Sequence, residues 1–143
     1  MSAQGPTIAD AIVSDCNAAT WSEVCTFERR YLPIESVESV DKVVVQVVYA
    51  GQTTTASSRG SWEHDYQIDF GVMAKLPTDD LRAADRYSTL LDAILDYWKT
   101  HKPTGTDAVM RGGEWLQPYV PQHMQELRQF TGVIRLTFRL VRT

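Results

Sequence analysis

The strongest constraint in the sequence is a stretch of residues 63–74 in which apolar and polar positions alternate. The apolar set is His64, Tyr66, Ile68, Phe70, Val72 and Ala74. The intervening set begins with Glu63, Asp65, Gln67 and Asp69. A period of two held over this length predicts a β-strand with one face on a hydrophobic core and one polar face.

The end of the chain repeats this alternation. Its apolar positions are Phe130, Ile134, Leu136, Phe138 and Leu140. We predict that this terminal strand pairs antiparallel with residues 63–74, with Tyr66 opposite Phe138, Ile68 opposite Leu136 and Phe70 opposite Ile134. The same register places Asp65 opposite Arg139 and Asp69 opposite Arg135, as oppositely charged cross-strand pairs. If the strands are not neighbours, the charged rows are expected to meet across a subunit boundary.

Two helices are predicted. The first begins at Thr7, which follows Pro6 and can cap the helix, and it ends between Asn17 and Thr20. The second begins at Pro77 and spans about 20 residues, with an apolar stripe at helical spacing. Trp98 lies on that stripe and is predicted to belong to the core.

Three further strands are predicted. Glu23–Leu32 has alternating character, and Lys42–Ala50 is rich in valine, whose β-branching favours strands. Because both faces of Lys42–Ala50 are apolar, we place it centrally in the sheet and covered on both sides. Glu114–Val120 contains Pro118, which belongs at a sheet edge or a bulge.

Two polar segments separate these elements. Gly51–Ser61 has no large apolar side chain, so we predict a mobile loop or the extended tip of a hairpin. His101–Gly113 is rich in glycine and proline and is predicted as a second long loop. Pro121–Leu127 is predicted as a single helical turn.

The predicted order is therefore helix, three strands, long helix, two strands. A chain of 143 residues is long enough for one domain and too short for two ordinary ones. Strands joined by hairpins indicate an antiparallel or mixed sheet of about five strands, with both helices mainly on one face. We expect a single α+β domain over residues 1–143.

The sequence carries no recognisable catalytic or cofactor motif. It has no glycine-rich phosphate loop, and His64, His101 and His123 are too widely spaced for a metal-binding pattern. We therefore predict no metal and no cofactor, and we expect His64 to make its own hydrogen bond at a strand end. Cys16 and Cys25 are predicted to be small reduced thiols in the interior.

Glu63, Asp65 and Asp69 are the carboxylates whose spacing could carry chemistry, because they project from one face of a strand. Paired carboxylates serve as general acid and base, so a small enzyme that uses this face is one alternative. A matching row of arginines elsewhere in the chain favours a salt-bridged or solvated face. We do not expect an enzyme.

The charge balance limits the possible partners. Fourteen basic and eighteen acidic residues give a net charge of −4, which does not favour binding to DNA, RNA or an anionic membrane surface. Residues 1–71 carry a net charge of −6 and residues 72–143 a net charge of +2. That asymmetry suggests complementary contacts within or between copies. No apolar run approaches the length of a membrane span, and the first residues lack the pattern of a secretory signal.

Tryptophans flank both polar segments. Trp62 follows the first segment and Trp115 follows the second, where an exposed aromatic side chain can anchor a protein interface. The candidate interface residues are Arg59, Trp62, Asp65, Asp69, Trp115, Arg135 and Arg139.

Three stretches together resemble one protein family. They are the capped first helix Thr7–Ile12, the loop and strand Arg59–Val72, and the terminal strand Arg128–Arg139. With the valine-rich strand and the long helix between them, they resemble small tail-terminator or tail-completion proteins of long-tailed bacteriophages. The resemblance covers most of the chain and lies in element order and strand character.

The resemblance implies an α+β domain that assembles with itself into a ring, a hexamer in that family. The ring sits on the head-proximal end of the tail tube, stops tube polymerisation and contacts a head-completion or connector protein. DNA passes through it without specific binding. The resemblance also implies a structural virion protein of the tail–head junction, assembled in the host cytoplasm, with no enzymatic activity, cofactor or membrane association.

Other functions stay open at this point. Within the same virion, the chain could be a head-closure or adaptor protein or a tail tube subunit. A binding module for a host protein would also suit the polar segments and tryptophans.

Overall fold

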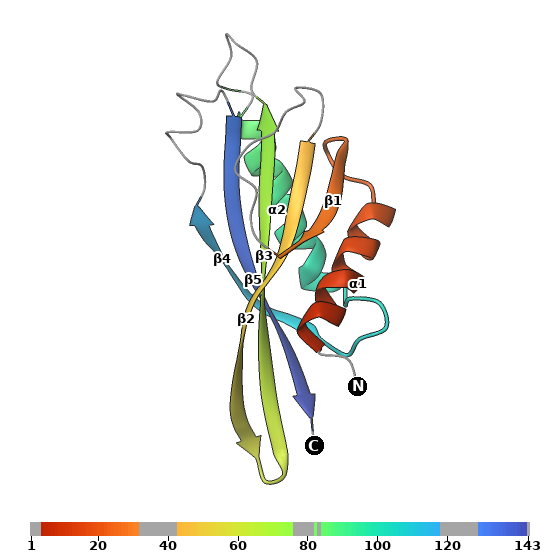
Figure 1. Ribbon diagram of the computed structural model, residues 1–143, viewed down its shortest axis with the longest axis vertical. Helices are drawn as coiled ribbons and strands as arrows, with labels where there is room; N and C mark the ends of the chain where they lie inside the picture. The colour runs from red at the N-terminus through yellow and green to blue at the C-terminus, as the bar shows by residue number, and fades with distance from the viewer. Residues whose placement is uncertain (1–3, 32–42, 76–81, 83, 118–128, 143) are drawn as a thin grey trace.

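The computed structural model describes residues 4–31, 43–75, 82, 84–117 and 129–142. Its elements follow in the order α1 (Gln4–Ala18), β1 (Cys25–Arg30), β2 (Val43–Ser58), β3 (Ser61–Lys75), α2 (Ala84–Thr100), β4 (Val109–Gln117) and β5 (Gln129–Arg142). Figure 1 shows one elongated sheet with both helices beside its upper part. The predicted α+β class and element order are confirmed.

The five strands form one mixed sheet in the order β1-β2-β3-β5-β4. β1 runs parallel to β2, whereas β2–β3, β3–β5 and β4–β5 are antiparallel. The expectation of hairpins between all consecutive strands is therefore wrong for β1 and β2, because a parallel pair requires a crossover connection. α1 contacts β1 and β2, and α2 contacts β3, β4 and β5.

The predicted register of β3 and β5 is confirmed. Tyr66 pairs with Phe138 and Ile68 with Leu136, and the same ladder continues in both directions from Trp62 to Lys75. This register places the apolar positions of both strands on the face that the helices cover. The pairing is therefore fixed by burial, because a shift of one residue would turn the apolar row toward the opposite face.

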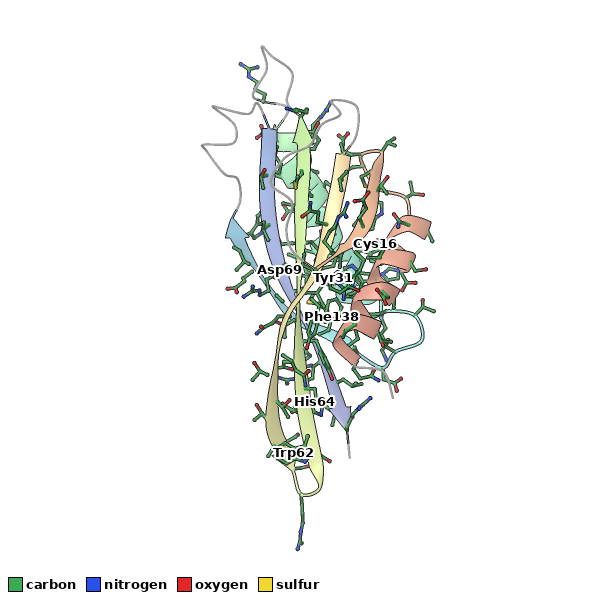
Figure 2. The ribbon with its side chains drawn as sticks, viewed as in Figure 1. Cys16, Tyr31, Trp62, His64, Asp69 and Phe138 are labelled. Atoms are coloured by element: carbon green, nitrogen blue, oxygen red, sulfur yellow. The ribbon has the colours of Figure 1, made fainter. Side chains whose placement is uncertain are left out.

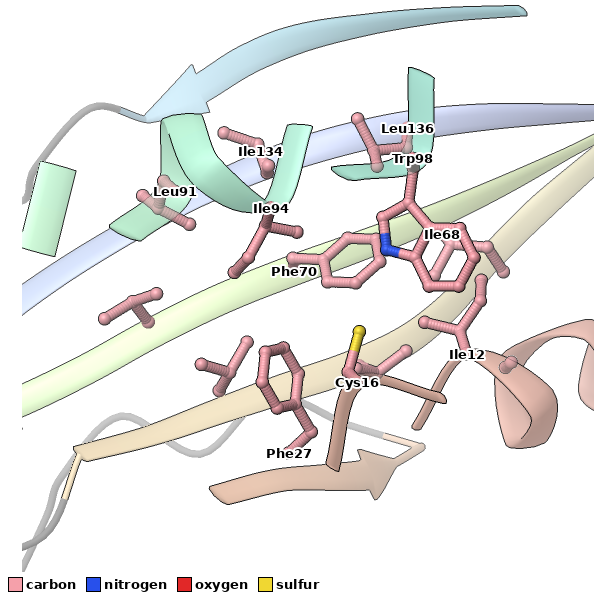
Figure 3. Close-up of a cluster of buried hydrophobic side chains, with 14 of the residues drawn as sticks. Ile12, Cys16, Phe27, Ile68, Phe70, Leu91, Ile94, Trp98, Ile134 and Leu136 are labelled. Carbon is pink, nitrogen blue, oxygen red and sulfur yellow. The ribbon is translucent and has the colours of Figure 1, made fainter. Parts of the chain in front are cut away.

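One hydrophobic cluster joins the helices to the sheet (Figure 3). α1 contributes Ile12 and Cys16, and α2 contributes Ile94 and Trp98. The Trp98 side chain is 1% exposed and meets the ring of Phe138 edge to face, with ring centroids 5.7 Å apart. The prediction that Trp98 belongs to the core is confirmed.

The first helix begins earlier than predicted. α1 starts at Gln4, so Pro6 lies inside its first turn and Thr7 is not the cap. Proline fits there because the first backbone N–H groups of a helix have no intrahelical acceptor to lose. The predicted end near Asn17 is confirmed, since α1 ends at Ala18.

β2 lies inside the sheet, as predicted, but it is not covered on both faces by helices. Val45 and Val47 on the helix side are fully buried, whereas Val44 and Val48 on the other side are half-buried. Beyond Ala50 the strand continues to Ser58, so Gly51–Ser61 is the extended tip of a hairpin and not a mobile loop. Gly60, with φ of 81°, forms the turn, because glycine adopts positive φ without strain.

The second polar segment is shorter than predicted. β4 begins at Val109, so the connection after α2 spans only residues 101–108. Gly113 belongs to this strand for a packing reason: a Cβ there would lie 2.6 Å from Leu95 Cδ1 and 2.8 Å from Leu136 Cδ2. A glycine inside a strand can thus permit close approach of a helix, and such a residue looks like a loop former in the sequence.

β4 is an edge strand, as predicted for Glu114–Val120. Several expectations fall outside the described residues: the start of the second helix at Pro77, the position of Pro118, and the helical turn over Pro121–Leu127. Within the described residues the second helix runs from Ala84 to Thr100.

Candidate interaction surface

Two bidentate ion pairs lie on the sheet face that the helices leave uncovered, here called the ion-pair face. Arg139 donates from Nε to Asp65 Oδ1 at 2.8 Å and from Nη2 to Oδ2 at 3.1 Å. Arg135 donates in the same way to Asp69, at 2.7 and 3.0 Å. Both predicted pairs therefore form within one chain, so the alternative in which these rows meet across a subunit boundary is not needed.

The arginines set the electrostatics of this face. Hydrogen bonding from Arg139 lowers the pKa of Asp65, and this effect outweighs the opposing effect of burial. The reciprocal hydrogen bonds raise the pKa of Arg135 and Arg139. The charged forms of Asp65, Arg135 and Arg139 are therefore stabilised, and both pairs have the planar two-point geometry of a carboxylate and a guanidinium.

This arrangement does not favour the carboxylates as a catalytic pair. Glu63 lies 3.5 Å from Arg139 Nη1 and accepts a hydrogen bond from Ser57 Oγ at 3.1 Å. A general acid working near neutral pH needs a raised pKa, whereas the pKa of Asp65 is lowered. The acidic row is better explained as part of a charged, cross-linked sheet surface.

The last part of β2, from Gly51, and the first part of β3, to His64, form a hairpin that extends beyond both helices and is here called the arm (Figures 1 and 2). Residues 52–60 are all exposed. Trp62 lies near the tip with 51% of its surface exposed, and Arg59 is in the turn. The Nδ1 atom of His64 lies 3.0 Å from Thr54 Oγ1, which confirms that His64 makes its own hydrogen bond near the strand end.

The predicted tryptophan sites are separated by the fold. Trp115 is half-buried and packs against the core, opposite Ile134. Trp62 pairs with Arg142 at the other end of β5. Trp62, Arg59 and the ion pairs are therefore surface features, whereas Trp115 mainly anchors β4 to the body. The structure does not bring the two tryptophans together.

An open hollow of about 390 Å³ lies where the arm joins the body. Its lining residues are Glu63, Asp107, Val109, Arg111, Arg139, Leu140 and Val141. Acidic, basic and aliphatic groups are mixed along its wall, and Arg139 already binds Asp65. The hollow is therefore a surface recess with balanced charge, without a convergent set of polar groups around an apolar pocket.

Within the described residues, no group of three or more His, Cys, Asp and Glu side chains is placed to hold a metal ion. The ring of His101 instead stacks on Tyr97, with ring centroids 3.9 Å apart. No helix in the same part of the chain is long and apolar enough to cross a membrane.

Cys16 and Cys25 are free thiols, and only Cys16 is fully buried. Burial raises the pKa of Cys16 to about 12. Burial also raises the pKa of Cys25, to about 11. Both thiols are therefore protonated, and hence weak nucleophiles, at neutral pH.

The shifted pKa of Cys16 predicts a loss of stability at alkaline pH. In the unfolded chain this thiol ionises near its ordinary pKa of 9.0, whereas the folded chain keeps it protonated up to about pH 12. The free energy of unfolding is therefore expected to be unaffected by this group below pH 9 and to fall between pH 9 and 12. Urea unfolding at several pH values measures this slope.

Cys16→Ala is the test variant and Cys25→Ala its matched control. Cys16→Ala is expected to flatten the alkaline slope more than the control, whatever its effect on stability at pH 7. Equal slopes in the wild type and in Cys16→Ala would contradict the assignment.

Sequence reasoning missed one feature of this surface, which is the free backbone edge of the arm. β1 pairs with β2 only from Val43 to Val48, so the outer edge of β2 beyond Tyr49 has no neighbouring strand among the described residues. The threonines at 53–55 favour a strand, but no residue within this segment indicates that β1 stops before reaching it.

Comparison of the sequence with models of known protein families and with curated proteins gives no match.

Proposed function

We propose that this chain is a structural protein of a long-tailed phage virion, which forms a ring at the tail–head junction and terminates the tail tube. The resemblance of Thr7–Ile12, Arg59–Val72 and Arg128–Arg139 to tail terminators suggests this role. The main structural support for the proposal is the arm, because its residues are exposed for contact with another protein and contribute little to the core.

The arm has no evident role in the stability of the domain. Every residue from Gln52 to Gly60 is exposed, and Trp62 presents half of its surface to solvent. An ordered strand of this length loses conformational entropy without burying apolar area in return. Contact with another protein would supply that missing burial, with Trp62 as an anchor.

A ring requires two different patches on each subunit that fit one another. The arm and the opposite edge of the sheet are the two patches that we assign to this contact. The ion-pair face neutralises Arg135 and Arg139 internally, so the arginines there do not form a free basic stripe for nucleic acid. Weak attraction to phosphate suits a ring through which DNA must move.

Electron microscopy of particles made without this chain tests the proposal. A terminator is expected to leave overlong tails that are not joined to heads. Heads that leak their DNA and lack a neck would instead indicate a head-closure or adaptor role, and absent tails would indicate a tube subunit. Tails of normal length attached to filled heads would contradict all three.

Complementation links the phenotype to the arm. Trp62→Ala is expected to rescue tail length and head joining poorly, because it removes the exposed anchor without disturbing the core. Asp92→Ala, at an exposed position of α2, is the control and should rescue fully. Full rescue by Trp62→Ala would show that the exposed tryptophan of the arm is not needed for tail termination or head joining.

A further inference from the structure

The arm carries a free strand edge that is not protected against pairing. Between two irregularities in the β2–β3 ladder, Gly51–Ala56 pairs regularly with β3 and leaves its other edge without a strand among the described residues. This segment contains no charged residue and no proline. Natural proteins usually guard exposed edges with such residues, because a bare edge is a template for another strand.

The sheet has a second free edge at its opposite side. β4 is the last strand in the order β1-β2-β3-β5-β4. Its regular segment, Gly112–Trp115, lies between two irregularities and pairs only with β5 among the described residues. Val109 and Leu116 at its two ends are exposed apolar residues. Among the described residues, one chain therefore offers the arm edge on one side of its sheet and the β4 edge on the other.

The directions of the two edges are compatible. β2 is antiparallel to β3, β3 to β5, and β5 to β4, so β4 runs antiparallel to β2. A second copy in the same orientation would thus place its β4 antiparallel to the arm, which is the more stable of the two ladder types. The arm segment has no charges, so it meets Arg111 and Glu114 of the second copy without like-charge repulsion.

Within one copy, only the start of β4 lies at the same height as the arm. Thr53 of the arm pairs with Asp65 of β3, which pairs with Arg139 of β5. Arg139 in turn pairs with Val109 of β4, so Thr53 and Val109 lie at the same height along the strands.

Glu114 lies level with Val48, because Arg135 and Asp69 connect them across the sheet. Bringing Glu114 beside Thr55 therefore requires the next copy to be displaced by six residues, about 20 Å, along the strands. This displacement places β4 beside the arm and clear of the part of β2 that pairs with β1, Val43–Val48.

We propose that copies of this chain join head to tail by strand addition, with the arm segment Gly51–Ala56 of one copy pairing with β4 of the next. The inference rests on the proposed ring and names the surfaces that build it. Each copy uses the arm edge and the β4 edge, and a closed ring leaves neither of these two exposed. Pairing between two arms would leave β4 open and would stop at a dimer.

Disulfide trapping tests the pairing. Thr55 and Glu114 are exposed and lie on the ion-pair face, opposite Glu63 and Arg135 respectively, so strand addition brings them to the same face of a shared sheet. Thr55→Cys with Glu114→Cys, in a Cys25→Ser background, is expected to give a ladder of covalent multimers on oxidation. Thr53→Cys with Glu114→Cys samples the next register on that face.

The single variants decide the topology. Thr55→Cys alone and Glu114→Cys alone are expected to stay monomeric on a denaturing gel, and a mixture of the two is expected to stop at dimers. Asp92→Cys with Glu114→Cys, which places one thiol on α2, is the control for random collision. Circular dichroism confirms that each variant is folded.

Three results would overturn the proposal. Efficient dimers from Thr55→Cys alone would indicate arm-to-arm pairing. Absence of cross-links in both double variants would exclude contact between these edges. A ladder from the Asp92 control as strong as that from the test pair would show that trapping is non-specific. The proposed function can fail separately. If the cross-links form but particles lacking the chain have tails of normal length joined to filled heads, the proposed function is rejected and the strand pairing between copies still stands.

Discussion

Replacing Trp98 by alanine is expected to lower the free energy of unfolding by about 3–5 kcal/mol, the range for truncation of a buried aromatic side chain. The indole is 1% exposed and lies near Cys16 of α1 in the core (Figure 3), and its ring centroid is 5.7 Å from that of Phe138 of β5. It also meets Tyr97 edge to face, at 4.9 Å between ring centroids. Removing it therefore leaves a cavity where both helices meet the sheet.

Urea unfolding followed by circular dichroism measures this loss. Trp62→Ala is the matched control, because it makes the same chemical change at a position with 51% exposure. The control is expected to cost less than about 1 kcal/mol, as surface substitutions usually do. A Trp98→Ala variant as stable as the control would mean that this interior is not packed as described.

Replacing Asp69 by alanine is expected to cost about 1–3 kcal/mol, because it leaves the Arg135 guanidinium without its two-point partner. The pair is only partly solvated, with side-chain exposures of 20% for Asp69 and 31% for Arg135. Arg135→Ala should cost a similar amount. The double variant is expected to cost clearly less than the sum of the two single changes, because the interaction is lost only once.

Asp96 and Lys99 provide the control cycle. Their side chains are 69% and 56% exposed, with 2.8 Å between Asp96 Oδ1 and Lys99 Nζ. Solvent screens such pairs, so their coupling is expected to be at most about 0.5 kcal/mol. A coupling between Asp69 and Arg135 as small as this would show that the ladder of ion pairs does not stabilise the sheet.

The ion pairs themselves were predictable from sequence because two independent patterns agree on one register. The apolar positions require Ile68 to face Leu136, and the charges require Asp69 to face Arg135. A strand shifted by one residue would satisfy neither requirement, because side chains alternate between the two faces.

The candidate interface residues differ in how far the fold leaves them exposed. Trp62 and Arg59 are exposed, as an interface anchor requires, but Trp115 packs against the core and the two ion pairs are satisfied within the chain. Flanking a polar segment is a local property, whereas exposure depends on which elements fold back over the residue. The free edge of the arm also could not be found locally, since it depends on where β1 stops.

The sequence by itself determined the element order, the pairing of β3 with β5 and the apolar face of the sheet, because these follow from side-chain periods of two and 3.6 residues along the chain. Only the tertiary structure decided that β1 runs parallel to β2, that Gly51–Ser58 continues as a strand, and that Gly113 lies in β4 against Leu95. These features depend on contacts between distant segments, and short polar or glycine-containing stretches adopt the conformation that their neighbours impose.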